Sequence, residues 1–517
     1  MDDSEIPAML ARQVAAVPDA TAISDGAVTR TWRELAERVA RWVAVLRAGG
    51  IQPGDAAALL LGNRVETFEA LLACLHRGVT AVPVNWHLTA TEAAYQLTDA
   101  DCRVLVVDEQ RAAVGAEAAT ARVSLRLVTG DRPYPGFTPV EPALAGVDPA
   151  LPPVLQDCGQ LMIYTSGTTG RPKGVLNGLF AGGAPFRRVD ALLRYASQTL
   201  GVPADGRVLL VGPWYHSAQL FFALLPLLNG AGLVIHPRFD AEAVLATLQE
   251  SRITECHLVP TQLVRLLRLD PAVRARFTGG SLRRVWHGGA ACPVDVKRAM
   301  LDWWGPVLVE YYAATEGGVV TLIEADEWLA RPGSVGRAVA PNRVLIVDEH
   351  GTELGPGRTG RVYVQRPGRS FTYHRAEAKT RDAHLRPGVF TYGEVGHLDA
   401  DGYLFLTGRA QQMVVTGGVN VYPAEVEAVL ATHPLVRDAA VLGLPDAEFG
   451  ERVAAVVELA PDAGDDPWPL LDEHCRRSLA GFKVPRQYRA VARMPRDETG
   501  KIRAEILRGL WESHAVS

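Results

Sequence analysis

The chain has 517 residues, more than one ordinary hydrophobic core can hold, so we expect two or more domains. Hydrophobic residues make up 48% and charged residues 21%, which is the balance of a globular protein. The formal net charge of -5 excludes the basic excess that a nucleic-acid-binding surface needs, so a phosphate-rich ligand would require a local site.

Short apolar runs of strand length alternate with helical segments as far as about Gly333. The expected helices lie at residues 31–50, 68–75, 219–228 and 240–250, and the expected strands at 56–61, 80–84, 104–107, 208–211, 232–236 and 254–259. This alternation predicts two α/β units, each with a parallel sheet covered by helices.

After Gly333 the sequence pattern changes to short expected strands separated by Gly/Pro turns, which suit a small barrel or meander. A compact α+β unit follows Arg409, with strands near 413–415 and 439–442 and a helix at 423–432. The predicted fold class is therefore α/β. We expect a large N-terminal domain, residues 1–408, made of two α/β subdomains plus a small β-barrel, and a small mobile α+β C-terminal domain, residues 409–517.

The cysteines and the apolar runs predict a cytoplasmic protein without a membrane span. Six cysteines are scattered without a CxxC pair, which indicates reduced thiols. The acidic start of the chain lacks the apolar run of a signal peptide. The most apolar stretch, residues 220–228, is too short to cross a bilayer.

Residues 164–174 concentrate glycine, serine and threonine around one lysine, directly after an apolar segment. Glycines let backbone N–H groups approach a ligand, hydroxyls add donors, and the lysine adds a point charge. The run therefore predicts a polyphosphate-binding loop. The P-loop of NTPases is excluded by spacing, because Gly167 and Gly170 are too close together and Lys173 is followed by Gly174.

The same run resembles the phosphate loop [YF]-T-S-G-T-T-G-x-P-K-G of the acyl- and aryl-CoA synthetase branch of the adenylate-forming superfamily. The resemblance covers nearly the whole chain, and later motifs recur in the family's order. It implies that ATP is bound by Thr165, Ser166, Gly167, Thr168, Thr169, Gly170 and Lys173, and that Thr165 also serves catalysis and the metal.

Residues 310–316 resemble the family's Y-G-x-T-E motif. The resemblance implies that Tyr312 stacks on adenine with Tyr311 and Ala313 beside it, that Thr315 contacts phosphate, and that Glu316 is catalytic and holds Mg²⁺. A hard cation that keeps several waters needs few protein oxygens, so one carboxylate with phosphates suffices. Ala313 replaces the usual glycine, and we expect its methyl group to reshape the acid pocket.

Two further segments resemble the adenine and acid sites. Residues 286–291 resemble the glycine-rich adenine-binding strand end, which implies nucleotide contacts from Gly288, Gly289, Ala290 and Ala291. Residues 213–216 resemble P-[LM]-[FY]-H, which implies a catalytic His216 between carboxylate and pantetheine. The implied substrate pocket comprises Trp214, His216, Gln219, His287, Gly288, Ala313, Ala314 and Gly317.

The last motifs fall around and after the predicted domain boundary. Glu394 stands where the family has the ribose-binding Asp of T-G-D, and its carboxylate can still accept two hydrogen bonds. Residues 408–413 resemble the hinge motif, which implies that Arg409 contacts ribose or phosphate and that Gln411 is the hinge. Gly417 and Gly418 resemble the loop that lines the pantetheine tunnel.

Residues 495–502 resemble the C-terminal P-x-x-x-x-G-K-[IL], which makes Lys501 the implied catalytic lysine. The resemblance as a whole implies an ATP-dependent acyl-CoA synthetase that uses ATP, Mg²⁺ and coenzyme A. The acid would attack ATP to give acyl-AMP and pyrophosphate. The C-terminal domain would then rotate about Gln411, and the CoA thiol would displace AMP.

The choice of acid and acceptor is left open at this point. Residues 213–228 contain no acidic side chain to hold an amino group, which disfavours amino acids. Residues 84–89 resemble those of fatty and alicyclic acyl-CoA synthetases, which favours a medium-chain or bulky alicyclic acid, with an aryl acid as the alternative. An acyl-AMP ligase that loads a carrier protein, a non-catalytic nucleotide-binding relative, and a homodimer also stay open.

Overall fold

The computed structural model describes residues 10–149, 157–165, 172–176, 184–185, 187–367, 371–409, 413–416, 419–446, 449–464, 466–498, 500–502 and 504–512. Of the predicted site residues, Ser166, Gly167, Thr168, Thr169, Gly170, Gln411, Gly417 and Gly418 lie outside these described ranges, as does the side chain of Arg409.

The first α/β unit is a five-stranded parallel sheet with helices on it. The strand order is β4-β3-β5-β6-β7, and every neighbouring pair is parallel. Its strands are β3 (Ala56–Leu60), β4 (Thr80–Pro83), β5 (Cys102–Asp108), β6 (Leu125–Thr129) and β7 (Thr138–Pro139). Its helices are α3 (Val65–Arg77), α4 (Ala90–Asp99), α5 (Ala112–Ala118) and α6 (Val140–Ala145).

The second α/β unit is a nine-stranded sheet in the order β18-β17-β16-β15-β14-β12-β13-β1-β2. The pairs from β16 to β1 are parallel, and both ends of the sheet are antiparallel. Its strands are β1 (Thr21–Ser24), β2 (Thr29–Thr31), β12 (Arg207–Leu210), β13 (Gly232–Ile235), β14 (Glu255–Leu258), β15 (Arg284–His287), β16 (Leu308–Ala314), β17 (Gly318–Ile323) and β18 (Arg337–Ala338).

The remaining helices of this part follow the apolar periodicity of the sequence. They are α1 (Ala11–Ala16), α2 (Trp32–Ala48), α7 (Arg187–Leu200), α8 (Ser217–Asn229), α9 (Ala241–Glu250), α10 (Pro260–Leu267), α11 (Pro271–Arg274), α12 (Val294–Trp304) and α13 (Ala325–Ala330). A capping box of Thr31 and Glu34 starts α2, because each side chain satisfies a backbone N–H that the helix leaves unpaired. Trp32 and Trp42, on one face of α2, are buried in the largest apolar core.

Three smaller sheets follow. β9 (Met162–Thr165), β10 (Lys173–Leu176) and β21 (Thr372–Tyr373) form one, and β8 (Asp157–Cys158) pairs with β11 (Ala184–Pro185). The predicted barrel region is a six-stranded sheet in the order β22-β23-β20-β24-β25, with β19 beside β20. Its elements are β19 (Arg343–Val347), β20 (Gly360–Gln365), α14 (Glu377–Asp382), β22 (His384–Arg386), β23 (Val389–Phe390), β24 (Glu394–Leu398) and β25 (Leu404–Arg409).

The C-terminal unit is α+β, as predicted. Its sheet has the order β27-β26-β29-β28, with β30 beside β29. The elements are β26 (Val414–Thr416), β27 (Val419–Val421), α15 (Pro423–Ala431), β28 (Val436–Asp446), β29 (Gly450–Leu459), α16 (Trp468–Ser478), a 3-10 turn (Gly481–Lys483), β30 (Gln487–Val491) and α17 (Ala504–Glu512). The predicted domain boundary after residue 408 falls at the end of β25.

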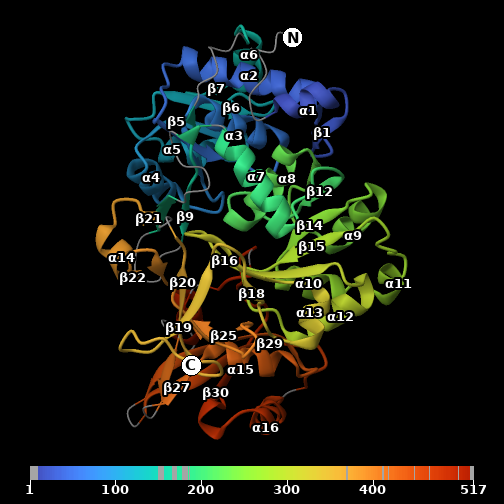
Figure 1. The fold of residues 1–517 in the computed structure, drawn as a ribbon, viewed down its shortest axis with the longest axis vertical. Coiled ribbons are helices and arrows are strands. Elements are labelled where there is room, and N and C mark those ends of the chain that lie inside the picture. The colour runs from blue at the N-terminus through green and yellow to red at the C-terminus, as the bar shows by residue number, and fades with distance from the viewer. Residues whose placement is uncertain are drawn as a thin grey trace.

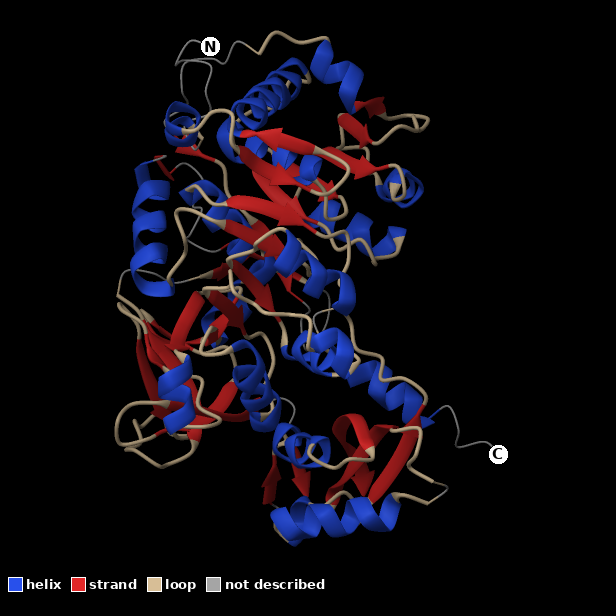
Figure 2. Ribbon diagram, turned by 90° about the vertical axis from the view of Figure 1, so that its right-hand side faces the viewer, coloured by secondary structure: helices blue, strands red, loops and turns tan. Residues whose placement is uncertain are grey.

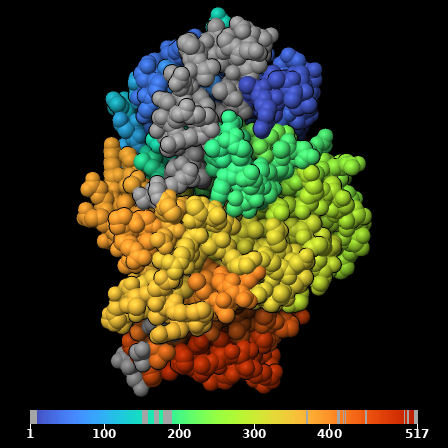
Figure 3. Space-filling model, in the orientation of Figure 1, coloured from blue at the N-terminus to red at the C-terminus, as the bar shows by residue number. Residues whose placement is uncertain are grey.

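The units are stacked along the long axis of the molecule. The five-stranded sheet lies at the top of Figure 1, the nine-stranded sheet in the middle and the C-terminal sheet at the bottom. Figure 2 shows the C-terminal strands lying between helices at the lower end. In Figure 3 the C-terminal residues, in red, abut the yellow and orange part of the chain.

All six cysteines are unpaired, in line with the reduced thiols that their spacing predicts. Within the described residues, no helix is both long and apolar enough to cross a membrane.

Candidate active site

A cavity of about 2930 Å³ lies where the middle of the chain meets the C-terminal unit. Residues far apart in the sequence line it. Of the predicted site residues, those on its wall are Thr165, Lys173, His216, Gln219, Gly288, Gly289, Ala290, Ala291, Tyr311, Tyr312, Ala313, Ala314, Thr315, Glu316, Gly317, Glu394 and Lys501.

The two ends of the predicted phosphate loop are the facing ends of a hairpin. β9 and β10 are antiparallel, and Thr165 lies opposite Lys173. β10 also pairs with β21, which places Tyr373 next to Val175. The hairpin therefore fixes Thr165 and Lys173 side by side at the cavity wall, although residues 166–171 between them are outside the described ranges.

A second lysine stands beside Lys173. Burial, followed by the positive charge of Lys379 on α14, lowers the pKa of Lys173 to about 8. The Lys173 ammonium also lies 5.9 Å from the ring centroid of Tyr373. Two cations at one wall of a cavity repel each other, and a polyanion bound there would relieve that repulsion.

Glu316 and Thr315 are tied to neighbouring elements. The hydroxyl of Tyr373 donates a 2.9 Å hydrogen bond to Glu316, and Thr315 shares a 2.9 Å hydrogen bond with Ser217 at the start of α8. Among the described residues, no cluster of three or more His, Cys, Asp or Glu side chains could hold a metal ion. Glu316 alone still fits Mg²⁺, because Mg²⁺ often binds one protein carboxylate and completes its coordination shell with phosphate oxygens and water.

Successive residues of β16 face opposite sides, as in any strand. The hydroxyl of Tyr312 donates a 2.7 Å hydrogen bond to Glu394 on β24, whereas the hydroxyl of Tyr311 lies 2.7 Å from Nε2 of His257 on β14. The register of β16 with β17 shifts between Tyr312 and Ala313. Tyr312 and Glu394 therefore form one wall of the cavity, and Tyr311 belongs to another.

The side chain of Tyr392 approaches this wall from below Glu316. Its hydroxyl is buried and has no hydrogen-bond partner among the residues that the structure describes, and a Cβ atom at Gly317 would lie 1.8 Å from it. A residue with any side chain at position 317 would displace the tyrosine. Because buried hydroxyl groups are normally satisfied, this one is a candidate for contact with a ligand.

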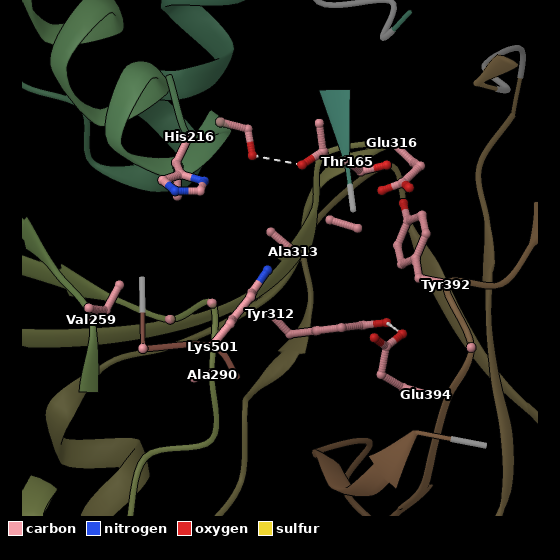
Figure 4. Close-up of a pocket in the computed structure, with 18 of the residues that line it drawn as sticks. Thr165, His216, Val259, Ala290, Tyr312, Ala313, Glu316, Tyr392, Glu394 and Lys501 are labelled. Atoms are coloured by element: carbon pink, nitrogen blue, oxygen red, sulfur yellow. Dashed lines mark hydrogen bonds between the residues drawn. The ribbon is translucent and has the colours of Figure 1, made fainter. Parts of the chain in front are cut away.

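His216 immediately precedes α8 and faces Lys501. Burial, and then the positive charge of Lys501, lower the pKa of His216 to about 3, so its ring is neutral at pH 7. In the view of Figure 4, Lys501 projects between His216 on one side and the pair of Tyr312 and Glu394 on the other. Lys501 thus brings a positive charge to the cavity beside His216.

A tight turn presents Lys501. The backbone N–H of Lys501 donates to the Asp497 carboxylate, and that of Asp497 donates to the Lys501 carbonyl, each at 2.9 Å. Arg496 braces the turn: it donates to the Gly500 carbonyl at 2.9 Å and forms a bidentate ion pair with Asp438 at 2.6 and 2.8 Å. The bidentate geometry fixes the orientation of the guanidinium.

Among the described residues, several contacts join this turn and its sheet to the rest of the protein. Glu498 lies 3.3 Å from Nε2 of His87, and Arg268 on α10 donates to the carbonyl of Arg437. Gly500, with φ of +79°, packs against α10 so closely that a Cβ atom would lie 2.8 Å from Thr261.

The opposite end of the cavity is largely apolar. Phe222 on α8 stacks on His257 with ring centroids 5.1 Å apart and on Trp286 at 4.7 Å. The apolar residues on the cavity wall near these rings include Leu192, Ala196, Leu200, Phe221 and Leu225. Such a pocket with few polar groups suits a small organic molecule.

Two residues predicted for the substrate pocket are instead in the core. Trp214 is fully buried and donates a 2.7 Å hydrogen bond from Nε1 to the carbonyl of Leu61. His287 is also fully buried, 3.8 Å from Glu310, which pairs with Lys297 at 2.7 Å. His287 ends β15 next to Gly288, which lines the cavity, and successive side chains of a strand face opposite sides. Trp214 lies in the turn before α8, next to Tyr215, which lines the cavity.

Several residues on the cavity wall have no counterpart in the sequence prediction. They are Phe222, His257, Tyr373, Lys379 and Tyr392. The alternation of strands could have suggested His257 as an inward-facing polar residue. The others carry no local signal, since an aromatic or a lysine in a helix or strand is usually structural or exposed.

The chain is similar to known proteins in sequence and in fold. Residues 10–374 match the AMP-binding enzyme family, and residues 425–501 match the C-terminal domain of AMP-binding enzymes. The chain is 35% identical to feruloyl-CoA synthase of an Amycolatopsis species over 94% of both chains. It is 31% identical to indoleacetate–CoA ligase of Aromatoleum aromaticum over 98% of both.

A solved structure gives the same result. The o-succinylbenzoate CoA synthetase MenE from Bacillus subtilis, in complex with its acyl-adenylate intermediate, superposes with a TM-score of 0.82 at 26% identity and covers 97% of this chain and 98% of that one. The chain therefore belongs to the AMP-binding, adenylate-forming enzymes. Within that class it is an ATP-dependent, AMP-forming acid–CoA ligase, and the predicted family, fold class and enzyme class are confirmed.

Proposed function

We propose that this ligase activates a ring-containing carboxylic acid and transfers its acyl group to coenzyme A. The observation that carries the proposal is the cavity itself. It runs from the cationic wall of Lys173 and Lys379, past Lys501, to the apolar wall of Phe222. One end suits a triphosphate and the other a flat or bulky hydrophobic group.

The chemistry of the first half-reaction follows from the charges at the centre of the cavity. A carboxylate is already ionised at neutral pH, so it needs no general base to attack the α-phosphorus. Lys501 would balance the negative charge that develops between the carboxylate and the α-phosphate. Thr165, Lys173 and Lys379 would hold the pyrophosphate as it leaves.

The nucleotide would be positioned by the wall that Tyr312 and Glu394 form. Their hydrogen bond holds the tyrosine ring, which supports adenine stacking on it. The carboxylate of Glu394 is an acceptor that suits the ribose hydroxyls. Mg²⁺, held by Glu316 and Thr165 with phosphate oxygens, would withdraw charge from the phosphates. Tyr373 would orient Glu316 through its hydrogen bond.

The second half-reaction needs room for a thiol where Lys501 now lies. We propose that the C-terminal domain rotates about Gln411, which withdraws Lys501 and brings the Gly417–Gly418 segment to the site. The contact between Glu498 of the Lys501 turn and His87 is made by exposed side chains, which supports such a rotation. The thiol would then attack the acyl carbonyl and AMP would leave.

The aromatic wall favours an aryl acid over an unbranched fatty acid. The rings of Phe222 and Tyr311 border the apolar end of the cavity and offer flat faces to a ring. The names of the relatives above specify feruloyl, indoleacetate and o-succinylbenzoate substrates, all of which contain a ring. A bulky alicyclic acid would fill the same space with poorer stacking.

An acid panel tests the proposal. Medium-chain fatty, alicyclic and aryl acids are each supplied with ATP and Mg²⁺, and acid-dependent pyrophosphate release is measured, followed by thioester formation with CoA or with a holo-carrier protein. The proposal expects the highest kcat/KM for a ring-containing acid and transfer to CoA. Absence of pyrophosphate release with every acid, or a clear preference for the unbranched acid, contradicts it.

A further inference from the structure

A buried chain of hydrogen bonds ends at the apolar part of the cavity. The backbone N–H of Gly212 donates to Oε1 of Gln219 at 3.3 Å. Nε2 of Gln219 lies 2.9 Å from Nδ1 of His257, and Nε2 of His257 lies 2.7 Å from the hydroxyl of Tyr311. Gln219, His257 and Tyr311 are at most 4% exposed, so water does not compete along the chain.

The backbone fixes the direction of these hydrogen bonds. An amide N–H can only donate, so the oxygen of Gln219 must face Gly212 and its NH₂ group must donate to Nδ1 of His257. His257 is neutral because complete burial lowers its pKa to about 3. A neutral imidazole that accepts at Nδ1 carries its proton on Nε2, and it therefore donates to the oxygen of Tyr311.

The hydroxyl proton of Tyr311 is consequently left to donate elsewhere. Among the residues that the structure describes, His257 is the hydrogen-bond partner of this hydroxyl, and that bond uses the oxygen as acceptor. Tyr311 lines the cavity, where its neighbours are Phe222 and other apolar side chains. A buried hydroxyl proton in apolar surroundings calls for an acceptor from the ligand or from water.

Two glycines leave the space that the side chains of this hydrogen-bond chain occupy. A Cβ atom at Gly212 would lie 2.4 Å from the amide of Gln219, and a Cβ atom at Gly288 would lie 2.9 Å from Cζ of Tyr311. Gln219 and Tyr311 thus occupy space that a side chain at either position would take. The stack of Phe222 on His257 fixes the imidazole plane as well. The donor at Tyr311 is therefore oriented before any ligand arrives.

We propose that Tyr311 donates a hydrogen bond to an acceptor oxygen on the ring end of the acid, so that the substrates are ring-containing acids with a carbonyl or ether oxygen on that end. This inference rests on the proposed function and narrows its substrate class. The relay from Gly212 through Gln219 and His257 makes the site select acceptors and reject groups of the same shape that lack one.

A matched pair of acids tests the inference. One is an arylpropenoic acid with a ring methoxy group, and the other carries an ethyl group of the same shape in its place. The kcat/KM ratio of methoxy over ethyl acid is measured by pyrophosphate release for the native enzyme and for Tyr311→Phe. We expect a native ratio of about tenfold at the best ring position, as one hydrogen bond supports, and a ratio near one in the variant.

The readout is a ratio within each protein, so general damage from the substitution cancels. Gln219→Met provides the second variant and serves if Tyr311→Phe does not fold. Without the amide, His257 can carry its proton on Nδ1 and accept at Nε2. It then accepts the hydroxyl hydrogen bond of Tyr311 that the ligand would otherwise accept. The ratio in this variant should also fall towards one.

The outcomes separate this inference from the proposed function. If the native enzyme activates neither acid nor any other of the panel, the proposed function is wrong. If it activates both acids with equal kcat/KM at every ring position, a water satisfies Tyr311 and the inference is overturned. A native preference that both variants keep also overturns it, because the preference then has another source.

Discussion

The hydroxyl of Tyr312 donates a 2.7 Å hydrogen bond to Glu394 and so joins β16 of the nine-stranded sheet to β24 of the six-stranded sheet. Glu394 stands where the family resemblance implies an aspartate. The longer glutamate reaches the tyrosine. Under the proposed function, the two residues together position the nucleoside.

Shortening this carboxylate should weaken ATP binding. Glu394→Asp withdraws the oxygen from Tyr312, and we expect the KM for ATP to rise about tenfold, the effect of one lost charged hydrogen bond. Steady-state kinetics with the best acid measure it. Glu349→Asp, at a side chain that is 85% exposed, is the matched control. An unchanged KM for ATP in Glu394→Asp would show that the carboxylate does not serve the nucleotide.

Removing the central cation should separate the two half-reactions. Lys501→Ala is expected to lower acyl-adenylate formation by at least about 100-fold, since it removes the charge that balances the transition state. Thioester formation from supplied acyl-adenylate should stay within about a few-fold of the native rate, because Lys501 takes no part in that step. Arg477→Ala, on exposed α16, is the control. An equal loss in both steps would contradict the domain rotation.

The interaction between Lys173 and Lys379 should affect the pH dependence of kcat/KM for ATP. The pKa of Lys173 is lowered to about 8 by burial and then by Lys379, so its charge is present below that pH and lost above it. Lys379→Met removes the second cause and should move the alkaline limb of kcat/KM for ATP to higher pH, while lowering its plateau because a cation is lost. A limb that does not move would rule out the coupling of the two lysines at the site.

Four histidines, three buried and one half-buried, should make stability fall in acid. Burial lowers the pKa of His76 to about 4, that of His216 and His257 to about 3, and that of His287 well below its usual value. Each is neutral when folded and gains a proton on unfolding below its unfolded pKa near 6.5. Their contribution is therefore complete above pH 6.5 and is lost as the pH falls towards the folded values.

Denaturant unfolding of the ligand-free protein between pH 7.5 and 5 measures this loss. The free energy of unfolding should fall by roughly 2 kcal/mol for each such histidine at pH 5. His287→Gln should reduce the slope against pH, whereas His350→Gln, at a side chain that is 78% exposed, should leave it unchanged. Identical slopes in both variants would mean that His287 titrates normally in the folded state.

The sequence predicts the elements of this fold better than it predicts the wall of the cavity. The apolar period of residues 31–50 identifies α2 closely, and the glycine-rich run at 164–174 locates the hairpin, because both signals are local. Lys379 and Tyr373 reach the site through the pairing of β21 with β10, which joins distant segments. Trp214 and His287, predicted for the substrate pocket, lie in the core, because a shift of one position along a strand or turn moves a side chain from the cavity to the core.

Gly500 gives the C-terminal unit a preference among its orientations. In the present arrangement a Cβ atom at this position would lie 2.8 Å from Thr261, and the backbone φ of +79° is itself unfavourable for other residues. Any larger residue would thus penalise the present orientation, in which Lys501 lines the cavity, relative to the rotated orientation of the proposed function. If the domain rotates as proposed, an alanine at position 500 would shift the balance of orientations away from the one that serves adenylation, without altering any group proposed to touch ATP.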